Sequence, residues 1–479
     1  MTTVLLESLN AWWPEIILSL GALAAILAGA AIRRPWPGRA VAWLALAASA
    51  WALWHAPVPP AAAPFFGLIL CDPFSLAFRW IALGTVALVA LMVSASRELA
   101  TDVEGESLGL LLLIGVGLML MAEANHLLMA YLAMELVSLG SYVLAGFLPE
   151  SRSAEAALKY LLFGALSSGI MLFGMSLLFG LTGQLAFPDL AQTTAGLASP
   201  IAEALLVAVA LVLVGLAFKI SMVPFHMWTP DVYEGAPVAV TAFLSVGPKA
   251  AGLALLVRLM EALKPLWPHV APWLCWLTVV TMTFGNLVAL AQTNVKRLLA
   301  YSTIGQVGYL LIGLSVGSPM GREALLLYLV AYLFMNLGAF ACVVAVVDDT
   351  GRESLDAFRG LHKRSPVLAL ACAVFLLSLA GIPPLLGFFG EFLLFGSALD
   401  AQQPWLAVAG AVNSAIALYY YVNIIRQMYC VAPERERRLV PAFPLRVALA
   451  VCAGATIALG VFPGKLLDLL GAALAVHLL

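Results

Sequence analysis

Long apolar stretches recur along the whole chain and limit what it can fold into. Of its 479 residues, 63% are hydrophobic and 10% are charged, whereas soluble domains carry roughly 25% charged residues. A helix needs about 20 mainly apolar residues to cross a bilayer. In lipid, only helices and closed barrels satisfy all their backbone polar groups. We therefore expect an all-α polytopic membrane protein.

Fourteen stretches are long enough to span. They cover residues 13–32, 39–57, 73–96, 106–123, 126–148, 155–182, 201–225, 236–260, 271–292, 295–316, 321–347, 366–398, 404–430 and 443–477. Pro463 interrupts the last one. The sequence thus predicts about fourteen transmembrane helices.

A weak internal repeat divides the chain. EAALKYLL at 155–162 resembles EALLLYLV at 323–330, and LLMAY at 127–131 resembles RLLAY at 297–301. Their near-constant spacing predicts that spans four to eight recur as spans nine to thirteen. Because five is odd, the second unit must be inverted, and inverted repeats with broken helices are typical of transporters. The predicted units are an N-terminal three-helix segment (1–104), two five-helix repeats (105–265 and 266–432) and a C-terminal helix (433–479).

Basic residues in the loops indicate the orientation. Fourteen Lys and Arg residues lie in loops after odd-numbered spans, and two lie in loops after even-numbered spans. Cytoplasmic loops carry the excess of basic residues. We expect the odd loops to face the cytoplasm, with both termini on the periplasmic side of a bacterial inner membrane and with lipid around the bundle.

Ionisable residues inside the spans are the candidate functional residues. A charge at the centre of a spanning helix costs about 2.5–3.5 kcal/mol on the lenient insertion scale and marks a functional site by default. Glu135, Lys219 and Lys249 lie well inside spans five, seven and eight, and Glu391 lies in span twelve. The full candidate set is Glu135, Lys219, Lys249 and Glu391, with Lys159 and His226 as weaker members.

Prolines lie close to three of these residues. Pro224, Pro248 and the 383–384 proline pair each remove helical hydrogen bonds. The freed carbonyls, with water, can solvate a charge or pass a proton. If span seven continues through Pro224, His226 lies on the same face as Lys219.

Simpler explanations exist for several residues. A proline in a spanning helix is often only a kink. Lys159 and Arg79 lie near span ends, where long side chains reach the interface. Glu123 fits an interfacial turn, and Lys296 fits an ordinary cytoplasmic residue. Mid-span position favours a functional role for Glu135, Lys219 and Lys249.

The candidate residues suggest proton transfer. Burial disfavours the charged form of a lysine, and a nearby ionised carboxylate favours it. A row of Glu, Lys, Lys and a terminal acid can therefore bind and release a proton as the Glu135–Lys219 distance changes. This mechanism needs no pocket for a small molecule.

Other chemistries find no support in the sequence. The net charge of −2 does not suggest a nucleic-acid partner. The six cysteines are scattered without a CxxC or Cys/His cluster, which argues against a metal, haem or iron–sulfur site. No Walker motif occurs. We expect no cofactor and no metal in this chain.

One stretch identifies a family resemblance. FKISMVPFHMWTPDVYEGAPVAVTAFLSVGPKA, at 218–250, resembles the central sequence of the antiporter-like subunits of respiratory complex I, most closely the subunit N type. ELVSLGSYVLAGF (135–147), VKRLLAYSTIGQVGYLLIGL (295–314) and GIPPLLGFFGEFLLF (381–395) are also similar to that subunit. The resemblance extends over essentially the whole chain.

The resemblance implies roles for individual residues. Glu135 matches a glutamate thought to pair with the lysine that Lys219 matches, and Lys249 matches the lysine of the central axis. Lys159 matches a lysine of helix six. Glu391 stands where subunit N usually has lysine and the related subunit M has glutamate, which puts the terminal proton carrier in doubt.

The resemblance also implies a function and partners. It implies a proton-translocating membrane-arm subunit of NADH–quinone oxidoreductase that works with other membrane-arm subunits, including the other antiporter-like ones. NAD, FMN and iron–sulfur clusters then belong to partner subunits. Two alternatives remain open, an Mrp-type cation/proton antiporter subunit and a non-conducting membrane scaffold. Cation-dependent proton flux from the purified chain favours the first, and tolerance of Lys219→Ala favours the second.

Overall fold

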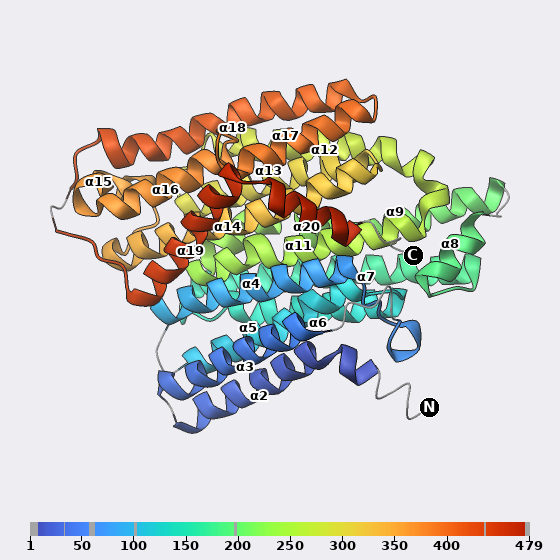
Figure 1. Ribbon diagram of the computed structural model, residues 1–479, viewed down its shortest axis with the longest axis horizontal. Coiled ribbons are helices and arrows are strands. Elements are labelled where there is room, and N and C mark those ends of the chain that lie inside the picture. The colour runs from blue at the N-terminus through green and yellow to red at the C-terminus, as the bar shows by residue number, and fades with distance from the viewer. Residues whose placement is uncertain are drawn as a thin grey trace.

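A computed structural model of the chain describes residues 8–32, 34–56, 63–99, 103–195, 199–434 and 437–474. These residues form a bundle of roughly aligned helices joined mostly by short loops (Figure 1). Their only β pairings are isolated bridges such as Ile69 with Ala124. The predicted all-α membrane fold is confirmed.

The helices follow one another closely. The long helices before the centre of the chain are α2 (Trp13–Ile32), α3 (Pro35–His55), α4 (Pro73–Ala95), α5 (Glu104–Glu123), α6 (Leu127–Ala145), α7 (Ser151–Thr182), α9 (Ser199–Ile220) and α11 (Val238–Ala262). Those after it are α12 (Trp267–Ala289), α13 (Val295–Ser315), α14 (Pro319–Thr350), α16 (Pro366–Leu379), α17 (Leu386–Asp400), α18 (Pro404–Cys430) and α19 (Phe443–Val461). Short helices include α8 (Phe187–Ala195), α10 (Trp228–Gly235), α15 (Leu361–Arg364) and α20 (Gly464–Leu474).

Twelve of the described helices are long and apolar enough to cross a membrane. Each coincides with a predicted span. Predicted span two, observed as α3, and predicted span twelve, observed as the pair α16 and α17, fall outside these twelve. The count of fourteen therefore stays a prediction.

Helix α11 forms the centre of the bundle, between α4, α5, α9 and α14 (Figure 1). Its most apolar 18-residue window is fully buried. A helix that is apolar on all sides must be covered by neighbours. Small residues allow close approach: a Cβ at Gly252 would lie 2.6 Å from Ile220 Cγ2 of α9.

Span seven ends earlier than the sequence suggests. Helix α9 stops at Ile220, Ser221 has a φ of 65°, and the chain is not helical again until α10. Carbonyls left free by this break are used locally, because Trp228 Nε1 donates to Phe218 O at 3.0 Å and Met222 N donates to Ala217 O at 2.8 Å. The helix does not continue through Pro224, so the condition under which His226 would share a helix face with Lys219 is not met.

Several lengths agree with the predicted repeat. Helices α7 and α14 each have 32 residues and begin 168 residues apart. Helices α6 and α13 begin 168 residues apart as well. Each half then contains a broken helix, α9 followed by α10 and α16 followed by α17. The inverted layout and the domain boundaries stay predictions.

Candidate functional site

Neighbouring turns of α6 carry Glu135 and Ser138, the serine that binds Lys219 of α9. Glu135 accepts a hydrogen bond from Ser168 Oγ of α7. Three residues later, Ser138 Oγ accepts a hydrogen bond of 2.6 Å from Lys219 Nζ and donates one of 2.7 Å to the carbonyl of Met134. Positions i and i+3 lie on one face of a helix. Within the described ranges no ion pair joins Glu135 to Lys219, and each group binds its own serine hydroxyl, Ser168 for Glu135 and Ser138 for Lys219.

Lys219 also lies against α11. It is fully buried at the broken end of α9. A Cβ on Gly252 would lie 3.4 Å from Lys219 Cγ. Lys249 is three residues before Gly252 on α11, so the stem of Lys219 packs about one turn of α11 away from the position of Lys249.

Lys249 occupies an aromatic site without a hydrogen-bond partner. It is fully buried, and its Nζ has no hydrogen-bond partner within the described part of the chain. The amine lies 4.5 Å from the ring centroid of Trp228 and 5.3 Å from that of Tyr233. Aromatic faces attract a cation but do not replace a hydrogen bond. The amine therefore has aromatic faces as neighbours and no fixed ion pair in the described part of the chain.

The second half of the molecule places Glu391 in a hydroxyl-rich site. Glu391 accepts hydrogen bonds from Tyr328 Oη at 3.2 Å and from Ser414 Oγ at 2.5 Å. Tyr328 Oη also contacts Gln306 Oε1, so its single proton is shared between these two acceptors. Gln306 Nε2 donates at 3.0 Å to the carbonyl of Leu379, which is the last residue of α16. The break in this helix thus supplies an acceptor, as the prolines predicted.

Buried polar side chains continue between the two halves. Asn336 Nδ2 of α14 donates to Ser245 Oγ of α11 at 2.6 Å, and Ser245 is one turn from Lys249. Tyr332 Oη of α14 donates to Thr303 Oγ1 of α13 at 3.0 Å, and Thr303 is one turn from Gln306. The row, called the buried row below, consists of Glu135, Ser138, Ser168, Lys219, Ser245, Lys249, Thr303, Gln306, Tyr328, Tyr332, Asn336, Glu391 and Ser414. All are buried except its two ends, Glu135 and Ser414, which are half-buried.

The two weaker candidates lie outside this row. Lys159 of α7 forms ion pairs of 2.8 Å with Glu155 and 2.9 Å with Asp231, and its side chain is 40% exposed. His226 lies in the non-helical link after α9, with its ring 4.5 Å from that of Phe284. Their weaker ranking in the sequence came from their places near the ends of predicted spans, and neither contacts a member of the row by a hydrogen bond or ion pair in the described part of the chain.

Three charges that the sequence suggested were interfacial or ordinary cytoplasmic residues are buried and have partners inside the protein. Arg79 and Glu123 are 3% and 0% exposed and form an ion pair with each other. Lys296 is 1% exposed and donates to the carbonyl of Ala236 at 2.7 Å. Glu15 lies inside the first apolar run, so the sequence already contained an acid that needed a buried partner. In the structure it pairs with Arg79 at 2.7 Å.

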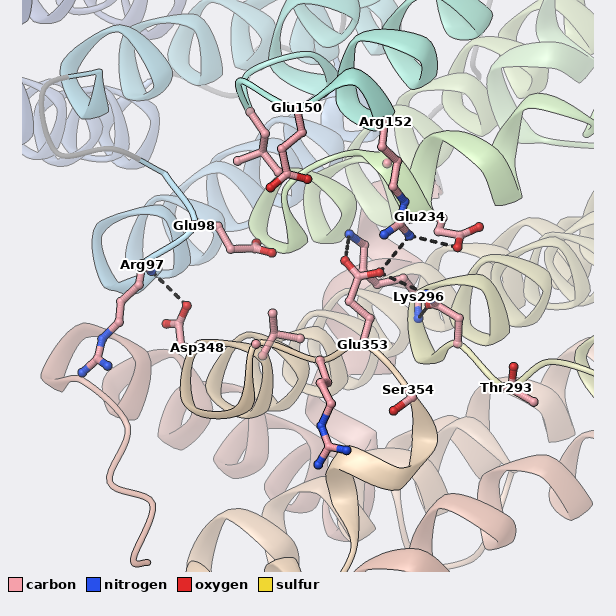
Figure 2. Close-up of a pocket in the computed structure, with 16 residues that line it drawn as sticks. Arg97, Glu98, Glu150, Arg152, Glu234, Thr293, Lys296, Asp348, Glu353 and Ser354 are labelled. Atoms are coloured by element: carbon pink, nitrogen blue, oxygen red, sulfur yellow. Dashed lines mark hydrogen bonds and ion pairs between the residues drawn. The ribbon is translucent and has the colours of Figure 1, made fainter. Parts of the chain in front are cut away.

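A charged cavity of about 700 Å³ opens at one end of the bundle (Figure 2). It lies where α4 and α14 end and where α7 and α13 begin. Its charged and polar lining comprises Arg97, Glu98, Glu150, Arg152, Glu234, Thr293, Asn294, Lys296, Asp348, Arg352, Glu353 and Ser354. The loops at this end carry the excess of basic residues, so it is the end predicted to face the cytoplasm.

The cavity reaches the start of the central helix. Glu98 Oε2 accepts a hydrogen bond of 2.7 Å from the backbone N–H of Val238, the first residue of α11. Burial raises the pKa of the Glu98 carboxyl, although the charge of Lys296 opposes this. Burial alone would also raise the pKa of Glu353, but its ion pair of 2.7 Å with Lys296 lowers it. The cavity therefore contains one carboxyl suited to binding a proton and one suited to staying ionised.

Ion pairs beside the cavity hold α10. Asp231 binds Arg297 of α13 at 2.9 Å, and Glu234 binds Arg297 at 2.7 Å. Burial would raise the pKa of Asp231, but hydrogen bonds from Lys159 and Arg297 outweigh it and lower the value. These pairs join α10, which lies between the segment bearing Lys219 and the helix bearing Lys249, to α7 and α13. No group of three or more His, Cys, Asp or Glu side chains among the described residues is arranged to hold a metal ion.

Comparisons with known proteins identify the family. Residues 124–417 match the model of the family described as NADH:quinone oxidoreductase/Mrp antiporter, TM. NADH-quinone oxidoreductase subunit N of Anaeromyxobacter sp. is 43% identical, with coverage of 95% of this chain and 94% of that protein. The chain belongs to the subunit N family of NADH-quinone oxidoreductases. A second member, subunit N 2 of Sorangium cellulosum, is 48% identical over 84% of each chain.

Solved structures agree with this membership of the subunit N family. A chain of respiratory complex I from Thermus thermophilus is 34% identical with a TM-score of 0.82, and the match covers 96% of this chain and 99% of that one. A chain of the Mrp complex from Dietzia sp. has a TM-score of 0.83 at 24% identity, covering 98% and 97% of the two chains. The Mrp likeness establishes a shared fold.

Proposed function

We propose that the chain is a proton-translocating membrane-arm subunit of NADH–quinone oxidoreductase. The observation that carries the proposal is the buried row, which holds two lysines and two glutamates among hydroxyl and amide groups inside a bundle of membrane-spanning helices. Intramembrane ionisable groups of this kind mark ion or proton pathways. Membership of the subunit N family supports the proposal that this row carries protons.

Proton movement along the row follows from its electrostatics. A charged Glu135 stabilises the charged form of Lys219, and loss of that interaction favours release of the lysine's proton. The next acceptor is Lys249, on the neighbouring helix α11, whose amine has no hydrogen-bond partner among the residues that the structure describes. From there the Ser245–Asn336 and Thr303–Tyr332 pairs lead towards Glu391. Glu391 is the terminal carrier in this scheme.

Uptake would begin at the charged cavity. Its end of the bundle carries the basic loops that favour the cytoplasm, so both termini would lie on the opposite side, in a bacterial plasma membrane. Glu98 offers a half-buried carboxyl with a raised pKa at the first residue of α11. Lys249 is 11 residues further along that helix, roughly 16 Å at 1.5 Å per residue.

The driving force would come from partner subunits. Moving one charge against the membrane potential costs about 2.3 kcal/mol per 100 mV. Oxidation of NADH by quinone, with NAD, FMN and iron–sulfur clusters bound elsewhere in the complex, would supply that energy. The partners are thus the other membrane-arm subunits, including the antiporter-like ones.

The proposal is tested by replacing the first acid of the row. Glu135→Gln in native membranes is expected to lower NADH-driven proton pumping at least tenfold while quinone reduction continues under uncoupled conditions. Glu203→Gln is the matched control, because Glu203 is exposed on α9. Unchanged pumping in Glu135→Gln would contradict the relay.

The Mrp-type alternative rests on the shared fold. A cation/proton exchanger would show proton flux that depends on Na⁺ or K⁺ and not on NADH. NADH-dependent flux without such cation dependence is the expected result. A scaffold would retain full pumping in every variant of the row.

A further inference from the structure

A second buried charge cluster lies at the other end of the bundle from the cavity. Helix α4 runs from this cluster, which begins at its capping residue Asp72, to the cavity at Arg97. Helix α11 runs the opposite way, from Glu98 at the cavity to Arg258. The buried row lies between the two ends.

Two carboxylates in the cluster share one arginine. Arg79 of α4 donates to Glu15 of α2 through Nε and Nη2, both at 2.7 Å. The same Nε forms an ion pair with Glu123, the last residue of α5. One oxygen of Glu15 and one of Glu123 thus contact the same nitrogen of Arg79, which brings the two carboxyls together. Two carboxylates so close cannot both ionise without a large penalty.

The remaining members do not supply the missing positive charge. Arg258 of α11 pairs with Asp72 at 2.8 Å and donates to the carbonyl of Ala122. The Cys71 thiol is the other titratable group facing the cluster. With Glu15 and Glu123, the cluster holds three carboxyls and two guanidiniums, all at most 4% exposed.

Two unbonded groups indicate that the cluster binds something further. Arg258 Nη1 is buried without a hydrogen-bond partner in the described part of the chain. Neither carboxyl oxygen of Glu123 has such a partner there, apart from the ion pair with Arg79. An uncompensated buried charge is strongly destabilising, and a bound proton removes it.

We propose that Glu15 and Glu123 hold one proton between them, and that this cluster is a second proton-binding site, separate from the buried row. The bound proton makes the five groups neutral overall and turns the contact between the carboxyls into a hydrogen bond. The site is separate because residues 250–257 of α11, between Lys249 and Arg258, are all apolar or glycine.

Use of the site in transport rests on the proposed function. Arg258 is nine residues beyond Lys249, roughly 14 Å along α11. A proton leaving the bundle at this end meets the Glu15–Glu123 pair as its last buried acid before the membrane surface. Whether the Glu15–Glu123 pair holds a proton does not depend on its use in transport.

Infrared difference spectroscopy of the intact NADH–quinone oxidoreductase complex tests the proposal. The wild-type complex is expected to have a protonated-carboxyl band, shifted in D₂O, that is lost in both Glu15→Gln and Glu123→Gln. Each variant leaves a single ionised carboxylate on Arg79. The matched control is Glu261→Gln, since Glu261 near the same end of α11 pairs one-to-one with Arg322 and is partly exposed. Glu261→Gln is expected to leave the band unchanged.

The outcomes separate this proposal from the proposed function. A band that survives in both Gln variants overturns the proton-binding site, whatever the pumping activity. Glutamine replaces a neutral carboxylic acid without changing the charge, so normal assembly is expected. Failure of both variants to assemble would mean two ionised carboxylates and would also overturn the proposal. Loss of the band together with full pumping in Glu135→Gln would leave the site intact and contradict the relay.

Discussion

Replacing Lys249 with methionine is expected to abolish proton pumping without lowering the stability of the protein. Methionine has nearly the shape of lysine, so it fits the same space at a cost below about 1.5 kcal/mol. It removes a buried amine that has no hydrogen-bond partner among the described residues. The variant is therefore expected to be at least as stable as the wild type and unable to pump.

The magnitude follows from the contacts of the amine. An unsatisfied buried polar group costs about 1–3 kcal/mol. Contact of a charged amine with Trp228 at 4.5 Å returns about 0.5–2 kcal/mol. Lys249→Met removes both effects, and the expected gain in stability is on the order of 1 kcal/mol.

Lys219→Met is the matched comparison. Its amine donates to Ser138 at 2.6 Å, and a hydrogen bond from a charged group is worth about 1.5–3 kcal/mol. Loss of this bond offsets relief from burial, so we expect no gain in stability. The assay is thermal inactivation of the purified complex, with NADH-driven pumping measured in parallel. A less stable Lys249→Met that still pumps would refute the reasoning.

Three further substitutions probe the cavity, α10 and the end of the row. Glu98→Gln is expected to slow pumping severalfold by removing the proposed first proton acceptor, while Glu150→Gln, exposed in the same cavity, has no effect on the rate. Asp231→Asn is expected to lower stability at pH 7 by up to about 1 kcal/mol, because the partly exposed carboxylate loses its ion pairs. The lowered pKa of Asp231 means that its contribution is complete above pH about 4 and is lost as pH falls through the folded-state pKa, so thermal unfolding at acidic pH should no longer distinguish the variant. Glu391→Gln is expected to reduce pumping at least tenfold, and equal pumping in Glu391→Gln and the exposed control Asp400→Asn would contradict a carrier role.

The sequence was sufficient to predict the helices because lipid leaves the backbone few choices. The bounds of α2, α4, α5 and α13 fall within two residues of the predicted spans. The span through Pro224 could not be predicted to end at Ile220, since proline permits either a kink or a stop. There the side chain of Trp228 and the N–H of Met222 decide the outcome by satisfying the carbonyls.

The candidate site was predictable only in part. Glu135, Lys219 and Lys249 were found because a charge in the middle of a span has few structural explanations. Their serine, tyrosine and amide neighbours were not, since such residues are common in spanning helices and only packing brings them together. Arg79 was misread as interfacial because its partners Glu15 and Glu123 are distant in sequence.

The number of protons translocated per NADH by a Lys219→Ala complex tests the central claim most directly. The measurement uses the assembled complex in sealed vesicles. The control is Lys264→Ala, because Lys264 is exposed at the end of the bundle opposite the charged cavity and lies outside the buried row. If the buried row carries protons, Lys219→Ala lowers the ratio while NADH oxidation continues under uncoupled conditions. A ratio equal to that of the wild type would contradict the account.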